Sequence, residues 1–141
     1  MIVVDTNVVS ELMRPRPSAS VLEWLDSNPS RDTWLTSISV AELLYGVTRL
    51  PVGVRKSGLE LAVIDVVEKD FARRILSFDL TAARYYGELV AARERLGRPI
   101  AIADAMIASI AVSVGATALA TRNVRDFAHT GLALINPWDG G

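Results

Sequence analysis

Met1-Ile-Val-Val-Asp-Thr-Asn7 is the stretch of sequence that decides the fold of this chain. Its apolar run, Ile2 to Val4, is typical of a short strand that is buried on both faces, and Asp5 ends the run with a charge. In open α/β sheets, ligands bind at the carboxyl ends of the strands, so the junction between this strand and the helix predicted over Thr6–Met13 is a candidate site. The alternative is that Asp5 only caps that helix.

The composition limits the class of protein. A chain of 141 residues with 50% hydrophobic content can bury a core of its own, so we expect residues 1–141 to form a single domain. The 15 Lys and Arg residues nearly balance the 16 Asp and Glu residues, so the net charge does not indicate a protein that binds nucleic acids or membrane surfaces. Most of the cations are Arg, however, which is the better bidentate donor to phosphate. The absence of Cys excludes disulfides and thiolate metal sites and fits a reducing compartment. Because no secretory signal is evident either, we expect a cytoplasmic protein.

Short apolar runs alternate with longer helical patterns along the rest of the chain. This alternation predicts an α/β fold, namely a three-layer α/β/α sandwich with a short, mainly parallel sheet. The expected further strands are Thr33–Thr36, Ile75–Phe78, Thr117–Ala120 and Leu132–Ile135. The expected further helices lie near Ser18–Asn28, Ser37–Val47, Gly58–Phe71, Ala82–Leu96 and Ile100–Val114.

Two acidic residues stand in helical segments that are otherwise strongly apolar. Glu42 follows Ser39 in the S-x-x-E order of a capping box, yet apolar neighbours enclose it in the sequence. Asp104 is the only charge in Ile100–Val114, which reads as a buried helix because it is apolar on every side and too short to span a membrane. A buried carboxylate must be neutralised, hydrogen-bonded or bound to a metal; the helix dipole alone would suffice only if Asp104 lay at the rim.

The acidic residues are predicted to converge at one edge of the sheet, where the strands end. Asp5, Glu42, Asp104 and the pair Asn123 and Asp126 all lie at or near such ends. Carboxylates that are close together raise each other's pKa, so a cluster of them implies a compensating cation. Oxygen ligands without Cys or a suitably placed His favour Mg²⁺ or Mn²⁺ over zinc. Such an ion promotes hydrolysis of phosphate esters.

Four short motifs follow one another along the chain: Val3-Val-Asp-Thr-Asn7, Ser39-Val-Ala-Glu-Leu43, Ala103-Asp-Ala-Met-Ile-Ala108 and Ala120-Thr-Arg-Asn-Val-Arg-Asp-Phe127. They occur in the order seen in the PIN-domain family, and the chain resembles its VapC-type toxins, particularly the branch that includes FitB. The resemblance covers essentially the whole chain, including a closing Asn136-Pro-Trp138 that is also found in that branch.

The resemblance assigns a role to each matching position. It implies that Asp5 and Asp104 bind Mg²⁺ directly and that Glu42 binds it directly or through water. It also implies that Asn7 and Ser39 orient these carboxylates.

The fourth acidic position of the family, which follows Thr-Arg, is Asn123 in this chain. An amide oxygen can coordinate a metal or hold a water, but it adds no charge and cannot act as a base, which puts a second metal and full nuclease activity in question. Asp126 is a possible substitute at a different offset. The candidate phosphate contacts near the predicted rim are Arg14, Arg16, Arg122 and Arg125.

The activity implied by the resemblance is that of a toxin, a Mg²⁺-dependent endoribonuclease that cuts RNA in single-stranded or looped regions. The implied partners are a cognate antitoxin that occludes the acidic pocket and a second copy of the toxin in a homodimer, with no role for a membrane. The alternative is a catalytically weak subunit that reaches operator DNA only through its antitoxin. An aspartyl-phosphate phosphatase is disfavoured because Asn7 replaces the second Asp of such enzymes, and no G-x-G-x-x-G or P-loop follows the first strand.

Overall fold

The first strand lies at the centre of a parallel sheet, as its apolar sequence predicts. The computed structural model describes residues 1–139, so the last two residues of the predicted domain, 140–141, lie outside it. The five-stranded sheet has the order β3-β2-β1-β4-β5, and every neighbouring pair is parallel. The strands are β1 (Ile2–Val4), β2 (Thr33–Thr36), β3 (Ile75–Leu76), β4 (Ala118–Ala120) and β5 (Leu134–Ile135). The carboxyl ends of all five strands therefore meet at one edge.

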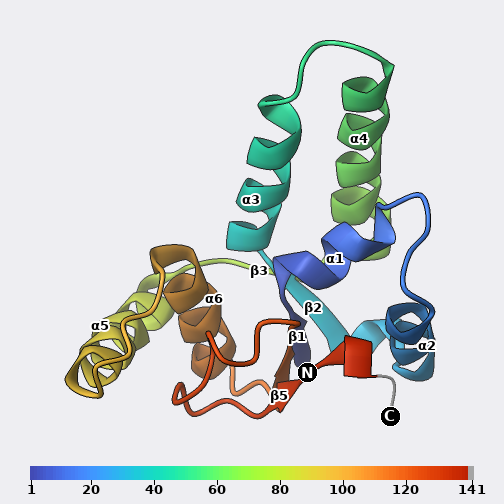
Figure 1. The fold of residues 1–141 in the computed structure, drawn as a ribbon. Helices are drawn as coiled ribbons and strands as arrows, with labels where there is room; N and C mark the ends of the chain where they lie inside the picture. Colours follow the sequence, from blue (N-terminus) through green and yellow to red (C-terminus); the bar gives the residue numbers. More distant parts are fainter. Residues whose placement is uncertain (140–141) are drawn as a thin grey trace.

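Helices cover both faces of the sheet and confirm the three-layer α/β/α prediction (Figure 1). One face packs against α1 (Thr6–Leu12), α2 (Ala19–Ser27), α3 (Ser37–Thr48) and α4 (Val54–Asp65). The other face packs against α5 (Leu80–Arg95) and α6 (Ile102–Ser113). Three short turns of other helix types complete the chain: Ser30–Asp32, Val66–Asp70 and Pro137–Asp139.

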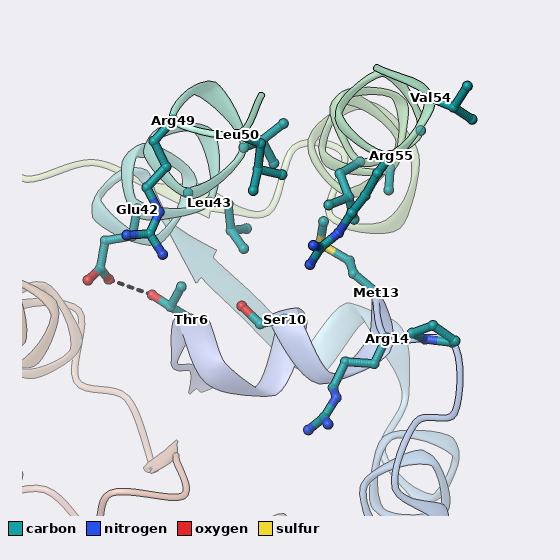
Figure 2. Close-up of a pocket in the computed structure, with 16 residues that line it drawn as sticks. Thr6, Ser10, Met13, Arg14, Glu42, Leu43, Arg49, Leu50, Val54 and Arg55 are labelled. Carbon is teal, nitrogen blue, oxygen red and sulfur yellow. Dashed lines mark hydrogen bonds between the residues drawn. The ribbon is translucent and has the colours of Figure 1, made fainter. Parts of the chain in front are cut away.

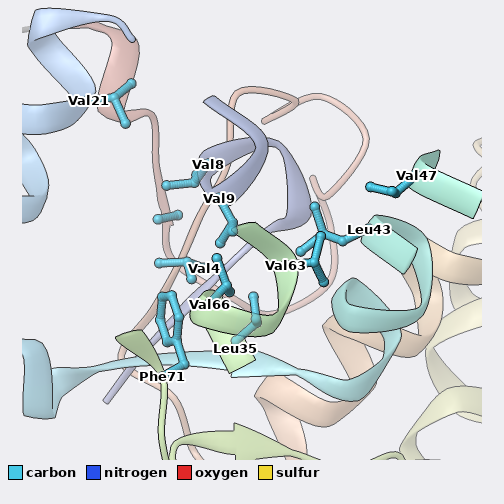
Figure 3. Close-up of a cluster of buried hydrophobic side chains, with 11 residues drawn as sticks. Val4, Val8, Val9, Val21, Leu35, Leu43, Val47, Val63, Val66 and Phe71 are labelled. Carbon is cyan, nitrogen blue, oxygen red and sulfur yellow. The ribbon is translucent and has the colours of Figure 1, made fainter. Parts of the chain in front are cut away.

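Alternation along the central strands builds the two cores. Val3 and Leu119 enter the core shared with α5 and α6, whereas Val4 and Ala120 enter the core beneath α1 to α4 (Figure 3). Successive side chains of a strand point to opposite faces, so an unbroken apolar run supplies both layers at once. This arrangement fixes where each strand ends, and hence where Asp5 is placed.

The structure differs from the predicted boundaries at several ends. The helix expected from Gly58 begins at Val54, directly after its N-cap Gly53, so Gly58 lies inside the helix. The strands at 75–78, 117–120 and 132–135 are each shorter than predicted. The expectation that α6 is buried on every side is wrong for its first turn, where Ile102 is 67% exposed. Asp104 lies in that first turn.

Among residues 1–139, none of the helices has the length and apolar content that crossing a bilayer would require.

Candidate active site

Asp5 is held through both oxygens of its carboxylate. It lies directly after β1 and is only 4% exposed. Its Oδ1 accepts a hydrogen bond from the backbone N–H of Thr6 at 2.8 Å, and its Oδ2 accepts one from the hydroxyl of Thr121 at 2.8 Å. Asp5 is therefore the N-cap of α1, as the alternative interpretation predicted, but capping accounts for only one oxygen. The second oxygen ties the end of β1 to the segment that follows β4.

Thr6 links the first helix to Glu42. Its hydroxyl donates to Glu42 Oε1 at 2.6 Å (Figure 2), and the same Oγ1 lies 2.8 Å from Ser39 Oγ. Ser39 is fully buried, so these contacts fix the start of α3 against the start of α1. Ser39 thus reaches the site through Thr6.

The capping-box interpretation of Ser39 and Glu42 is wrong. The N-cap of α3 is Thr36, whose Oγ1 accepts a hydrogen bond from the backbone N–H of Ser39 at 3.1 Å. Glu42 therefore has no capping role and lies beyond the first turn. It is also exposed, contrary to the enclosure that its apolar sequence neighbours indicated, because those neighbours point to other sides of the helix.

Asp104 is held far less tightly than Asp5. It is partly buried in the first turn of α6 and accepts no hydrogen bond from the described residues 1–139. Its pKa is raised to about 6, first by burial and then by the charges of Asp5, Asp126 and Glu42, while Arg93 opposes the rise. Within residues 1–139, burial and the neighbouring acids therefore outweigh Arg93 and disfavour the charged form of Asp104.

Four carboxylates from separate segments lie close enough to influence one another. We call Asp5, Glu42, Asp104 and Asp126 the acidic cluster. Burial raises the pKa of Asp5, hydrogen bonds from Thr121 and Thr6 lower it, and the charges of Glu42 and Asp126 raise it again. The ion pairs within residues 1–139 go to Glu11, Asp32 and Asp65, so none of them neutralises the acidic cluster.

The acidic cluster fits a hard divalent cation by its chemistry. Its donors are all carboxylate oxygens, which Mg²⁺ and Mn²⁺ prefer, and its unneutralised repulsion is what such an ion would relieve. The side chains are not closed around a common point, since no three acidic or histidine residues among 1–139 form a ready metal-ligating group. An ion would therefore draw together carboxylates that are close but not yet convergent.

The turn after β4 presents Asp126 rather than Asn123 as its charged group. Asn123 is exposed, and its backbone N–H donates to Thr121 Oγ1 at 3.0 Å. Asp126 closes the turn with a hydrogen bond from its N–H to Asn123 O at 3.0 Å. Asn7 accepts a bond of 3.4 Å from the backbone N–H of Arg122, so it contacts this turn and not a carboxylate.

The four candidate phosphate contacts are spread over the surface. Arg14 pairs with Glu11 at 3.4 Å, and the guanidinium of Arg122 lies 5.1 Å above the ring of Trp138. Arg16 and Arg125 are exposed, and their side chains make no hydrogen bond or ion pair within residues 1–139. Within residues 1–139, Arg14 and Arg122 are therefore held by a neighbouring side chain, whereas Arg16 and Arg125 are not.

Sequence reasoning missed three residues that shape the site: Thr6, Thr121 and Arg93. Both threonines lie within the quoted motifs, next to Asp5 and two residues before Asn123, so the sequence could have pointed to their hydroxyls. Arg93 stands in a charged stretch that is typical of a solvated helix face, yet it is only 4% exposed. Only its hydrogen bonds to backbone carbonyls of the folded chain reveal it.

A groove of about 890 Å³ adjoins the acidic cluster between α1, α3 and α4. We call it the helical groove. Thr6 and Glu42 line one part of it, Leu43, Val47 and Leu59 give it an apolar floor, and Figure 2 shows Arg14, Arg49 and Arg55 around it.

Comparison with known proteins places this geometry in a family. The family model for the PIN domain matches residues 2–132. The chain is 42% identical to the plasmid stability protein StbB of Pseudomonas syringae pv. tomato over 139 residues, which is 99% of each chain. It is 40% identical to the VapC ribonuclease Y4jK of Sinorhizobium fredii, over 99% of each chain, and 40% identical to toxin FitB of Neisseria gonorrhoeae, over 98% of this chain and 99% of FitB.

Solved structures agree with these relatives. The structure of FitAB bound to an IR36 DNA fragment contains a chain that matches with a TM-score of 0.90 and 38% identity, over 98% of this chain and 96% of that one. VapBC2 from Rickettsia felis, bound to a DNA fragment from its promoter, matches with a TM-score of 0.79 and 28% identity, over 96% and 98% of the two chains. The chain therefore belongs to the PIN-domain family, among the VapC and FitB-like toxins of toxin–antitoxin pairs.

Proposed function

We propose that this chain is the toxin of its pair and a Mg²⁺-dependent endoribonuclease, with Mn²⁺ as an alternative ion, and that residues 1–141 act as one PIN-like domain. The observation that carries the proposal is the acidic cluster: four carboxylates from separate segments lie at the carboxyl edge of the sheet, where their charges raise the pKa of Asp5 and Asp104, without an ion pair among residues 1–139 to neutralise them. The proposed reaction places the chain in the cytoplasm, where its RNA is.

Asp5, Asp104 and Glu42 would hold the ion, which when bound would activate water and polarise the scissile phosphate. Asp5 is oriented for this by Thr6 and Thr121, which fix its two oxygens before any ligand arrives. Thr6 also orients Glu42 through the 2.6 Å hydrogen bond, so one threonine places two of the three ligands. Ser39, which lies beside the hydroxyl of Thr6, supports that placement.

Asp126 contributes the fourth negative charge in this proposal. Its charge raises the pKa of both Asp5 and Asp104, whereas the side chain of Asn123 brings no charge to the turn. Asn123 is left the lesser role of holding a water or the phosphate through its amide. Asn7 keeps the turn in place through Arg122.

RNA is the proposed substrate, because Y4jK is named a ribonuclease and resembles this chain over nearly its full length. Arg122 is the best-placed phosphate contact, since its guanidinium is stacked on Trp138 beside the turn that carries Asp126. Arg14, at the helical groove, is a second candidate. The side chains of Arg16 and Arg125, which make no contact of this kind within residues 1–139, would bind phosphates further along a longer RNA.

The proposed protein partners are a cognate antitoxin and a second copy of the toxin in a homodimer. We propose that a segment of the antitoxin lies in the helical groove, because the groove is apolar, runs up to Glu42 and carries arginines that suit an acidic partner. A side chain added at Gly46 would enter the groove without a clash, so Gly46→Leu should weaken antitoxin binding, while Gly87→Leu on α5 should not. Light scattering of the purified toxin tests the homodimer.

A second function is favoured by the DNA present in the FitAB and VapBC2 structures. In that case the chain is a catalytically weak subunit that strengthens binding of operator DNA only through its antitoxin. Tight operator binding by the complex, together with no cleavage of any RNA pool by the toxin, would select it.

Cleavage of a total RNA pool by the purified chain tests the favoured function. We expect cleavage with Mg²⁺, loss of cleavage on chelation, and a decrease of about 100-fold or more in Asp104→Asn and Asp5→Asn, because a lost ligand should cost at least as much as a lost supporting residue. Glu60→Gln, an exposed helical control, should cleave normally. Cleavage that survives both chelation and Asp5→Asn would defeat the proposal.

A further inference from the structure

Arg93 is a buried arginine whose guanidinium binds backbone carbonyls. It lies near the end of α5 and is only 4% exposed. Its Nε–H donates to Arg98 O at 2.6 Å, and its Nη1 donates to Asp126 O at 2.8 Å and to Ala128 O at 2.9 Å. No carboxylate among residues 1–139 forms an ion pair with it. A charge that is buried without an oppositely charged partner costs free energy, so the contacts of Arg93 must account for its position.

Two of the three carbonyls belong to the turn that carries Asp126. The residue between them, Phe127, has a fully buried side chain in the core beneath α5 and α6. The turn is thus attached from two sides, by an apolar side chain facing the core and by two carbonyls facing Arg93. Asp126 itself is exposed and its carboxylate accepts no hydrogen bond within residues 1–139. Its place in the acidic cluster is therefore set by its backbone alone.

The contacts require an arginine rather than any cation. A guanidinium presents several N–H donors in one rigid plane, so it can serve carbonyls from two segments at once, whereas a lysine offers a compact point charge on a flexible stem. Arg93 meets Arg98 on one side and the turn on the other, which joins the end of α5 to the segment after β4. The charge of Arg93 also lowers the pKa of Asp104, which shows that the guanidinium lies near the acidic cluster.

We propose that Arg93 is a positioning residue for the metal site: by binding the carbonyls of Asp126 and Ala128 it fixes the turn and so holds the Asp126 carboxylate beside Asp5 and Asp104. The inference rests on the proposed function, since it gives Asp126 a part in holding the ion. It adds a residue outside the acidic cluster that decides how well the ion is held.

The test is the affinity of the full-length purified chain for added Mn²⁺, measured by calorimetry and by the Mn²⁺ electron paramagnetic resonance signal. Arg93→Lys keeps the charge and loses the planar donors, and it should weaken Mn²⁺ binding by roughly 10-fold or more, as loss of a supporting residue does in metal sites. Arg95→Lys, on the same helix but exposed, is the matched control and should bind as the unmodified chain does.

A double-mutant cycle separates positioning from a general effect on the fold. In an Asp126→Asn background, Arg93→Lys should change Mn²⁺ affinity by no more than about 2-fold, because the group that Arg93 positions is already gone. Equal losses in both backgrounds would overturn the proposal, as would an unchanged affinity in the Arg93→Lys single variant. If the unmodified chain binds no Mn²⁺, the proposed function fails instead.

Amide hydrogen exchange gives a readout that needs no metal. In Arg93→Lys the amides of Asp126 and Ala128 should exchange at least about 10-fold faster, whereas those in the middle of α6 should not change. Unchanged exchange at the turn would contradict the proposal even if metal affinity fell. Arg93→Gln, which keeps a planar donor without charge, serves as the second variant; if both variants lose cooperative unfolding, Arg93 is required for the fold and the positioning role is refuted.

Discussion

Asp5 and Asp104 are two carboxylates of one acidic cluster, yet the chain holds them in opposite ways. Asp5 is almost fully buried and both of its oxygens accept hydrogen bonds, from Thr6 and Thr121. Asp104 is partly buried, accepts no hydrogen bond within residues 1–139, and has a pKa raised to about 6. The first acid serves the fold as well as the site. The second has no hydrogen-bonded role in the fold within residues 1–139.

The difference shows that the end of β1 and the start of α6 contribute differently to this edge of the sheet. The strand end supplies a fixed anchor, because the helix that follows it and the threonine after β4 both bind its carboxylate. The helix start supplies a charge that burial and the other acids disfavour more than Arg93 favours it. Removing Asp5 should therefore destabilise the chain, whereas removing Asp104 should not.

The largest expected effect is on the free energy of unfolding of the metal-free chain at pH 8. Asp5→Ala should lower it by about 1–3 kcal/mol, because α1 loses its cap and the buried hydroxyl of Thr121 loses its partner. Asp104→Ala should leave it unchanged or raise it, because a desolvated and repelled charge is removed. Denaturant titration measures both, with Glu60→Ala as the exposed helical control. Destabilisation of similar size by both variants would erase the distinction.

The next effect is the pH dependence of stability. Because the pKa of Asp104 is raised from 3.8 to about 6, the folded chain binds more protons than the unfolded chain between these values, so stability falls as pH rises through that window. The expected loss is roughly 1–3 kcal/mol for a partly buried group. Asp104→Asn should reduce the dependence in this window in metal-free buffer and leave the part that belongs to Asp5, whose pKa is also raised, while Asp26→Asn, an exposed acid on α2, should not change it. An undiminished slope in Asp104→Asn would assign the dependence to other groups.

The smallest expected effect concerns Asn123. Since Asp126 already provides the negative charge of this turn, Asn123→Asp should change Mg²⁺ affinity by less than about 3-fold, which is below 1 kcal/mol. Calorimetric titration of both chains measures it, with Asp126→Asn as the opposite change, expected to weaken binding more. An affinity gain of more than about 10-fold in Asn123→Asp would show that the fourth charge is missing from this chain.

Much of the fold was predictable because it depends on local patterns. The unbroken run at Ile2–Val4 predicted a strand buried on both faces, and the structure places it at the centre of the sheet. The predicted strand Thr33–Thr36 is confirmed as β2, and Gly115 ends α6 with a φ of 67° that suits a glycine. The ends of other elements were less predictable. A strand ends where the neighbouring strand no longer pairs with it, and a helix begins where the preceding turn ends.

The candidate site was predictable in its acids and less so in their supports. Asp5, Glu42 and Asp104 are each brought to the carboxyl edge of the sheet, and their roles as metal ligands stay predictions. The capping role of Glu42 was wrong, because Thr36 takes that place. Arg93 could not be found from its neighbours, since nothing in a charged helical segment indicates which arginine faces a loop that lies more than thirty residues further along the chain.

The sequence by itself determined the two-faced strands, the order of strands and helices, and the family to which the chain belongs, because hydrophobic periodicity and short motifs are properties of neighbouring residues. Only the tertiary structure decided that the charge of Asp126 acts on Asp5 and Asp104, that Thr6 and Thr121 bind the carboxylate of Asp5, and that Arg93 binds the backbone of the turn. These contacts depend on which segments the parallel crossovers bring side by side. The burial of a side chain, and the effect of one charge on a distant residue, exist only once the chain is folded.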